Sequence, residues 1–465
     1  MTEPIQVLED FFPLKSYNHI IEGNALTLDW AKLVPIDKLN FIMGNPPFVG
    51  QSVRSKVQSD EMALIWGKGA NETKLDYVIC WYKKALDCIK GTTIKVAFVS
   101  TNSICQGESV PTFWKKMIDN GATINFAYTT FAWDSETSDK AAVHCVIVSF
   151  ALVDDNPKLL FNGTTKRESK HINPYLHDAP DIWITNRINK PRNGLPKMTT
   201  GSPPNDDGGL LMTADEKMKL EAKYPVLAKY IRPFIGAREF LHDKVGSFSR
   251  YCLWFKDVNP SDFANISVIK ERLQKVKAIR ERSSADRIKK MADYPYLFCQ
   301  NRQPDSTYIV IPRVSSETRK YIPISFLSPN IIASDACIII PNVSPYEFAV
   351  LSSSIHMAWV KLVSGRLGVS IRYAPAVYNN FPWPAHSDKQ RIKIESCAQK
   401  ILEARKKFPD SSLADLYDPL TMPEELLKAH RENDAAVCEA YGFEKNITEE
   451  EIVSELMKMY SSAFS

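Results

Sequence analysis

The stretch NFIMGNPPFVGQS, residues 40–52, decides the fold. Its first four residues, 40–43, form an apolar run that stops at Gly44, and Asn45 and two prolines follow. Proline lacks the N–H that a sheet requires, so we predict a buried strand over 40–43 and a loop at its carboxyl end. Ligands of open α/β sheets bind at the carboxyl ends of strands. We therefore expect a binding site at residues 44–48.

The residues of this loop suit methyl transfer to an exocyclic amine. Such an amine is a poor nucleophile because its lone pair is delocalised into the ring. The Asn45 side-chain oxygen and the Pro46 carbonyl are adjacent acceptors for its two hydrogens, and Pro46 and Pro47 fix the backbone that holds them. Phe48 offers a face on which an extruded base can stack. The alternative is a plain proline turn, since Asn-Pro-Pro also occurs by chance.

Strand and helix patterns alternate after the loop, which indicates an α/β sheet. Apolar positions at helical spacing predict a helix over 74–90, and Gly91 ends it. Asp76 either starts that helix or supports the loop at 44–48. The other predicted elements are strands at 94–100, 122–130 and 141–151 and a helix at 111–120.

The composition and periodicity of the sequence change after a first domain, residues 1–155. Residues 156–195 are rich in Pro, Gly, Asn and Asp and are predicted to be a linker region. Short strands and helices over 196–386, with a long basic helix at 261–291, predict an α+β domain. Residues 387–465 are predicted to be a helical segment. The fold class we expect is therefore an α/β sheet domain followed by an α+β domain and a helical end.

Charge and cysteine content narrow the class of protein. The net charge is only +4, but residues 261–290 carry nine Lys and Arg against four Asp and Glu. Such a basic tract fits a protein in which only one region binds a polyanion, although a solvated helix face explains it equally well. The nine cysteines form no CxxC pair, so we expect reduced thiols, no metal site and a cytoplasmic protein. No apolar run is long enough to cross a membrane.

Several blocks resemble one family, the MmeI-like (type IIL) restriction-modification enzymes, in which one polypeptide carries methyltransferase and target-recognition domains. The blocks in 1–155 are GNALTLDW (23–30), GNPPFVGQS (44–52), LDYVICWYKKA (75–85), AFVSTNSICQGESVPTFW (97–114) and AAVHCVIVSF (141–150). Those in 196–386 are RPFIGAREF (232–240), PRVSSETRKYIPI (312–324) and YNNFPWP (378–384). The resemblance implies the C-terminal part of a class I (Rossmann-like) methyltransferase domain followed by a target recognition domain. The implied reaction is methyl transfer from S-adenosylmethionine to the N6 amine of adenine in duplex DNA.

The resemblance also implies roles for individual residues. Asn45–Phe48 would bind and orient the flipped adenine, and Asn24 would approach the adenine ring of S-adenosylmethionine, although an ordinary turn explains Asn24 equally well. Phe131 or Trp133 would form the opposite wall of the base pocket, unless these rings only pack in a core.

One part of the family pattern has no counterpart in this sequence. The glycine-rich donor loop, close to DPACGSGNF in the family, and the acidic strand end that binds the donor ribose both precede the blocks above, and neither is found here. The family's nuclease domain is missing as well. We therefore expect a shortened chain, a broken gene, or a second polypeptide that supplies this half, and little methyl transfer by the 465 residues alone.

Basic residues of 196–386 are the candidates for contact with double-stranded DNA. Arginine suits bidentate contact with guanine, and basic helix residues suit phosphates. For any single arginine, a surface ion pair is the commoner role. The loop and turn candidates are Arg232, Arg238, Arg313, Arg319, Arg366 and Arg372, and the helix candidates are Lys275, Lys277 and Arg280.

Two other functions stay open at this point. The chain is a DNA-recognition module without catalysis that works with a partner chain, or it is an RNA or protein methyltransferase, because NPPF-type loops occur in those enzymes too. The long recognition tract argues against the second. Salt-dependent binding to duplex DNA separates it from the others.

Overall fold

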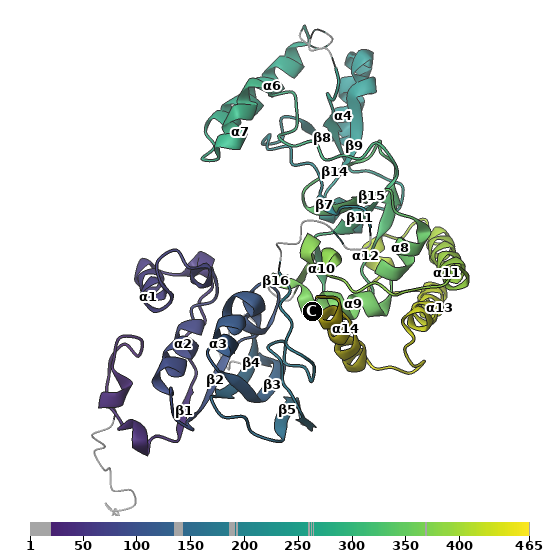
Figure 1. The fold of residues 1–465 in the computed structure, drawn as a ribbon. Coiled ribbons are helices and arrows are strands. Elements are labelled where there is room, and N and C mark those ends of the chain that lie inside the picture. The colour runs from purple at the N-terminus through teal and green to yellow at the C-terminus, as the bar shows by residue number, and fades with distance from the viewer. Residues whose placement is uncertain are drawn as a thin grey trace, which may run out of the picture. The chain divides into compact units, whose positions relative to one another are not determined.

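The computed structural model describes residues 20–133, 143–185, 191, 194–258, 261, 263, 265–367 and 370–464. It divides into two compact units (Figure 1). The first consists of Met1–Ile104 and Thr112–Ile172, and the second of Cys105–Pro111 and Asn173–Ser465.

The first unit contains a six-stranded sheet in the order β1-β2-β4-β3-β5-β6. β1 lies at one edge and is parallel to β2, with Gly44 opposite Phe98. β4 runs antiparallel to both of its neighbours, β2 and β3, whereas β3 and β5 are parallel. The four strands predicted in this region are present, but the prediction that the first of them is buried is wrong, because Phe41 and Met43 of β1 are exposed at the edge of the sheet. The strands are β1 (Phe41–Gly44), β2 (Lys95–Thr101), β3 (Thr123–Trp133), β4 (Val143–Ala151), β5 (Lys158–Asn162) and β6 (Thr165–Ser169).

A short hairpin changes one predicted boundary. The linker prediction for 156–195 is wrong over 158–169, because β5 and β6 pair there and extend the sheet. Alternate residues of β5 are buried, and the buried Lys158 ammonium contacts the Asn125 Oδ1 at 3.0 Å and the Asp154 carboxylate. A strand of five residues among polar turn residues gives too weak a pattern to be recognised in the sequence.

Two of the predicted helices of the first unit are shorter than the sequence indicates. The helix predicted at 74–90 is α2 (Ile79–Cys88), which begins later because Asn71–Lys74 form a separate 3-10 turn. Tyr82 on α2 is fully buried, and its hydroxyl lies 2.8 Å from the Ser100 Oγ of β2. The helix predicted at 111–120 is a π-helical turn followed by the short α3 (Lys115–Asp119).

Helix α1 (Lys56–Trp66) was not predicted. The Ser55 hydroxyl accepts a hydrogen bond from the Gln58 N–H, and the Gln58 side chain accepts one from the Ser55 N–H. This capping box satisfies two backbone donors at the start of the helix. The Ser-x-x-Gln spacing of residues 55–58 is the sequence signal that could have predicted the start of this helix.

The second unit mixes short strands with helices, as the sequence predicts for an α+β domain. Its strands form three small sheets in the orders β14-β9-β10-β8, β13-β11-β15-β7 and β12-β17-β16. The strands are β7 (Thr199–Thr200), β8 (Leu211–Thr213), β9 (Ile231–Ile235), β10 (Arg250–Leu253), β11 (Tyr308–Pro312), β12 (Val314–Ser316), β13 (Ser325–Leu327), β14 (Ile332–Ala333), β15 (Cys337–Pro341), β16 (Gly365–Leu367) and β17 (Ser370–Arg372). The helices are α4 (Ala214–Lys223), α5 (Ala237–His242), α6 (Ser267–Glu281), α7 (Asp286–Lys290), α8 (Pro345–Leu351), α9 (Ser354–Val363), α10 (Pro375–Asn379), α11 (Asp388–Lys406), α12 (Leu413–Leu416), α13 (Glu424–Tyr441) and α14 (Glu449–Phe464).

The end of the second unit is helical, as predicted. α11 packs against α13, and α14 packs against α9 (Figure 1). Gly442 ends α13 with a φ of 72°, a conformation that glycine adopts without steric cost. A buried chain of hydrogen bonds joins these helices: Arg405 Nε donates to the Tyr417 hydroxyl at 2.8 Å, which lies 2.9 Å from His430 Nε2. Burial lowers the pKa of His430, so its ring is neutral.

The structure also bears on membrane-spanning helices, metal ligands and cysteines. Within the described ranges, every helix is too short or too polar to span a bilayer. The same residues contain no group of three or more His, Cys, Asp or Glu side chains placed to hold a metal ion. All nine cysteines are free thiols.

Candidate active site and DNA-binding residues

The predicted catalytic loop borders a cavity of the first unit. β1 ends at Gly44, and the cavity, of about 910 Å³, is lined by Asn45, Pro46 and Pro47 directly after it. Asn45 is exposed, Pro46 is buried and Phe48 is half-buried. The Asn45 side chain is therefore accessible from the cavity, whereas Pro46 lies below the surface. Phe48 does not line the cavity.

Asp76 holds the far end of this loop. Its Oδ1 accepts hydrogen bonds from the N–H of Val49 at 3.2 Å and from the N–H of Val78 at 3.1 Å, and its Oδ2 accepts one from the Thr101 hydroxyl at 3.2 Å. The Tyr77 N–H donates to the Val49 carbonyl at 3.0 Å. Asp76 therefore combines the two roles that the sequence left open, because it caps the turn that leads into α2 and supports the loop. Burial raises the pKa of Asp76, against the effect of its hydrogen bonds.

Asn24 borders the same cavity. Its segment is fixed by Trp30, whose indole N–H donates to the Ala25 carbonyl at 2.8 Å, and by Lys84 of α2, whose ammonium donates to the Leu26 carbonyl at 2.7 Å. The Lys84 ammonium also lies 5.2 Å from the centre of the Trp30 ring. The fold thus brings the residue predicted to face the methyl donor to the cavity that contains the predicted catalytic loop.

Sequence reasoning missed Glu61 of α1, which also lines this cavity. Its carboxylate accepts hydrogen bonds from the Asn24 Nδ2 and from the Tyr77 hydroxyl. Asn24 and Tyr77 are 37 and 16 residues away from Glu61 in the sequence. A capped helix was recognisable from the sequence, but the partners of Glu61 were not, because only the folded chain brings them together.

Phe131 and Trp133 lie at the end of β3, outside the residues that line the cavity. Phe131 is half-buried and Trp133 is 41% exposed, and their ring centroids are 6.4 Å apart. The next residues of that segment lie outside the described part of the chain. Stacking on the target base stays a prediction for both rings.

The prediction that Arg280 contacts phosphate is wrong. Its side chain is fully buried, and its nitrogens donate to backbone carbonyls. The acceptors are the carbonyls of Asn205, Met291, Tyr294, Pro204 and Leu297, at 2.7–3.1 Å. Arg280 follows Ile269 and Val276 on the buried face of α6, so its guanidinium satisfies loop carbonyls instead of facing solvent. Burial lowers its pKa.

The other basic residues of this part of the chain are accessible to different degrees. Lys275 and Lys277 are exposed on α6, and Arg238 is exposed on α5. Arg232 on β9 is half-buried, and its Nη1 donates to its own neighbour, the Ile231 carbonyl, at 3.1 Å. These four residues stay candidates for DNA contact, with the three exposed ones the better placed.

The remaining arginines gather around one small sheet, β12-β17-β16. Arg372 is exposed on β17 and pairs with Val314 of β12, and the carbonyl of the preceding residue, Arg313, accepts a 2.9 Å hydrogen bond from the Tyr373 N–H. Arg319 is half-buried and donates to the Ser315 hydroxyl at 3.1 Å. Burial lowers the pKa of Arg319. Arg366 belongs to β16, but its side chain is outside the described part.

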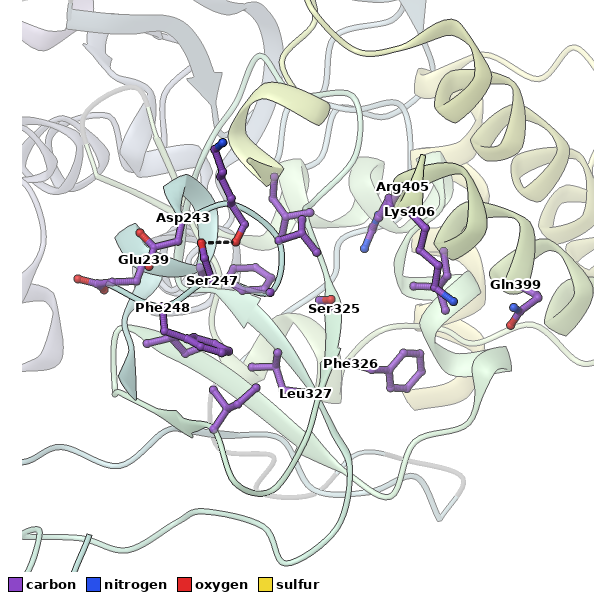
Figure 2. A pocket seen from close by; sticks show the side chains of 18 residues that line it. Glu239, Asp243, Ser247, Phe248, Ser325, Phe326, Leu327, Gln399, Arg405 and Lys406 are labelled. Atoms are coloured by element: carbon purple, nitrogen blue, oxygen red, sulfur yellow. Dashed lines mark hydrogen bonds between the residues drawn. The ribbon is translucent and has the colours of Figure 1, made fainter. Parts of the chain in front are cut away.

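A second cavity, of about 400 Å³, lies in the second unit between α5, β13 and α11 (Figure 2). Polar groups at its edge pair within the protein: Lys244 with Asp410 at 3.0 Å, and the Ser247 hydroxyl with the Lys244 carbonyl at 2.8 Å. It contains none of the predicted site residues, so it is separate from the candidate active site.

Comparison with known proteins divides the chain into three matched segments. Residues 1–162 match the model described as "MmeI, DNA-methyltransferase domain", residues 178–385 match "MmeI, target recognition domain", and residues 386–464 match "MmeI, C-terminal domain". The chain belongs to the MmeI family. These segments account for the resemblance of the sequence blocks and for the α/β and α+β character of the two units.

Two relatives of this MmeI-family chain agree with that assignment. DNA methyltransferase A of Bacillus subtilis (strain 168) is 37% identical over 452 residues, which cover 96% of this chain and 51% of the relative. The solved structure of the type IIL restriction-modification enzyme MmeI in complex with DNA is 41% identical, with a TM-score of 0.85, over 98% of this chain and 61% of that chain. The chain therefore spans about half to three-fifths of the length of these relatives.

Proposed function

We propose that this chain carries the base pocket and the target-recognition part of a site-specific DNA methyltransferase of a restriction-modification system. The proposed reaction transfers a methyl group from S-adenosylmethionine to the N6 amine of an adenine flipped out of duplex DNA, which would place the protein in the cytoplasm. The observation that supports it most directly is the position of Asn45 and Pro46 at the tip of β1, on a cavity shared with Asn24.

The chemistry follows from the acceptors of the loop. The Asn45 side-chain oxygen and the Pro46 carbonyl accept the two hydrogens of the adenine amine, which draws the nitrogen toward tetrahedral geometry and makes its lone pair available. Because Pro46 and Pro47 restrict the backbone, the acceptors are arranged before the base arrives. Phe48 is proposed to stack on the base, which would offset part of the cost of extrusion.

The residues around the cavity fit the proposed donor. A volume of about 910 Å³ is in the range of ligand pockets, and aromatic side chains such as Trp30 and Trp81 offer flat faces for a purine. Asn24 is proposed to hold the adenine ring of the donor. When bound, S-adenosylmethionine supplies an electrophilic methyl group, and the chain's residues supply orientation and hydrogen-bond acceptors.

We infer that further donor-binding residues come from chain segments that adjoin β1. No described strand pairs with the second edge of β1, and its Phe41 and Met43 side chains are 61% and 78% exposed. An exposed apolar edge strand is a template for further pairing. The 465 residues alone are therefore expected to methylate DNA weakly, and a separate methyltransferase half is the proposed partner.

Duplex DNA is the proposed partner of the second unit. We assign phosphate contact to Lys275 and Lys277, and phosphate or base contact to Arg238 and Arg372, because these side chains are exposed on α6, α5 and β17. Arg232, Arg313 and Arg319 stay candidates of lower accessibility, and Arg366 is a candidate whose side chain is not described. Together they are proposed to select the target sequence.

The test of this function is methylation in cells that lack their own adenine methylation. The chain is expressed alone and together with the part of the B. subtilis relative that it does not match, and N6-methyladenine is measured in hydrolysed DNA. We expect methylation when both are present and its loss in Asn45→Ala, whose fold should be intact because Asn45 is exposed. Sequence-preferring DNA binding with no methylation under either condition would instead support a recognition module without catalysis.

A further inference from the structure

Glu61 connects the two sides of the candidate active site. One oxygen of its carboxylate, Oε1, accepts a hydrogen bond from the Asn24 Nδ2, and the other, Oε2, accepts one from the Tyr77 hydroxyl. All three side chains line the same cavity. A single half-buried carboxylate on α1 thus contacts the segment proposed to face the methyl donor and the segment that follows the catalytic loop.

The contact with Glu61 fixes the orientation of the Asn24 amide. Asn24 Oδ1 accepts a hydrogen bond from the Leu26 N–H at 2.9 Å, while its Nδ2 donates to Glu61. Reversal of the amide would place two donors together at Leu26 and two acceptors together at Glu61. The oxygen of Asn24 therefore has a fixed position, and its second lone pair is available to a ligand in the cavity.

The contact with Tyr77 extends to the catalytic loop. The Tyr77 N–H donates to the Val49 carbonyl at 3.0 Å, and the Val49 N–H donates to Asp76. Burial and the Glu61 hydrogen bond both raise the pKa of Tyr77, so the hydroxyl keeps its proton and stays a donor. A displacement of Glu61 would therefore move the residue that directly follows Phe48.

We propose that Glu61 is a positioning residue, which holds the Asn24 oxygen toward the methyl donor and Tyr77 against the catalytic loop. This inference rests on the proposed function. It assigns a task to a residue outside the blocks that resemble the family. It also explains why an amide, and not a carboxylate, suits position 24: a carboxylate there would lie beside that of Glu61 and be repelled by it.

A reciprocal exchange of the two side chains tests the proposal. Binding of S-adenosylmethionine to the 465-residue chain is measured by ligand-observed NMR titration for the wild type, Asn24→Asp, Glu61→Gln and the double variant. We expect each single variant to bind about tenfold more weakly, as for loss of a charge-assisted hydrogen bond. We expect the double variant to recover most of the affinity, because the amide at 61 then donates to the carboxylate at 24.

Asp60→Asn is the matched control, because Asp60 is the neighbouring exposed acid on α1 and its loss changes the charge equally. We expect Asp60→Asn to bind like the wild type. The proposal is overturned if the wild type does not bind, if Glu61→Gln and Asp60→Asn behave alike, or if the double variant is no better than the single variants.

Further measurements distinguish an effect on donor binding from effects on folding and on catalysis. Thermal unfolding of every variant identifies loss of fold, and if Glu61→Gln unfolds, Asn24→Ala and Tyr77→Phe replace it by removing one contact each. Weaker binding in Asn24→Ala but not in Tyr77→Phe supports the proposal, and unchanged binding in Asn24→Ala overturns it. Because the titration needs no methyl transfer, a failure of the cellular methylation test rejects the proposed function without changing this readout.

Discussion

The carboxylate of Asp76 accepts a 3.2 Å hydrogen bond from the backbone N–H of Val49, the residue directly after the NPPF loop. Two prolines restrict the loop from within, and this bond restricts it at its end. The same carboxylate accepts a hydrogen bond from the Val78 N–H, directly before α2. The end of the loop is therefore attached to the start of this helix. A loop held in this way presents its acceptors in one arrangement, which is what electrostatic stabilisation of a transition state requires.

Replacement of Asp76 by alanine is expected to lower stability by about 3 kcal/mol, because three donors lose their acceptor. Methylation in the cellular test should fall further than stability alone explains, since the loop loses its anchor. Chemical denaturation and the methylation measurement check the two parts. Equal activity of Asp76→Ala and the wild type would contradict the role of this residue in holding the loop.

The stability of the chain should depend on pH through Asp76. Because burial raises its pKa above the ordinary 3.8, folding favours the protonated carboxyl. The stability of the wild type relative to Asp76→Asn should therefore be greatest at acidic pH and decrease as pH rises through the raised pKa. Thermal unfolding of both proteins from roughly pH 4 to pH 8 measures this difference. A difference that grows with pH would mean that the hydrogen bonds outweigh burial.

Arg280→Ala is expected to destabilise the second unit by roughly 3–5 kcal/mol, because buried carbonyls lose their charged donor. Denaturant unfolding measures the loss. Lys277→Ala, on the exposed face of the same helix, is the control and should change stability by less than about 0.5 kcal/mol. If Arg280→Ala folds normally and only weakens DNA binding, its assignment to the core is wrong.

Arg372→Ala is expected to weaken binding to duplex DNA and to reduce the slope of log affinity against log salt by about one if Arg372 contacts a phosphate. Fluorescence anisotropy at several salt concentrations measures both quantities. Lys400→Ala removes the same charge from α11, where the lysine pairs with Glu432 at 2.6 Å, and should leave the slope unchanged. Identical slopes for all three proteins would argue against a DNA contact at β17.

Met43→Glu is expected to leave the stability of the isolated chain unchanged, because Met43 is 78% exposed on the edge strand. It should abolish methylation in the presence of the complementing part, since a charge then lies where we propose further strands to pack. Leu64→Glu, at a site on α1 that is 70% exposed, is the matched control and should remain active. Full activity of Met43→Glu would exclude this edge as the contact.

Local patterns determined the elements around the site. The apolar run 40–43 followed by two prolines required a strand that ends in a loop, and period and length placed the neighbouring strands and α2. The same reasoning failed for β5 and β6, whose short strands lie among turn residues. A strand of five residues carries little periodic signal, so its pairing with β3 decides its conformation.

The sequence by itself predicted which residues are candidates for the chemistry: Asn45, the two prolines after it, and a tract of arginines and lysines. Only the tertiary structure decided which side chains are exposed to solvent and which form hydrogen bonds with distant residues. Arg280 is buried because it lies on the buried face of α6. Glu61 contacts Asn24 and Tyr77 because folding brings distant segments to one cavity. Residue type is a local property, whereas burial and hydrogen-bond partners depend on contacts between segments far apart in the chain.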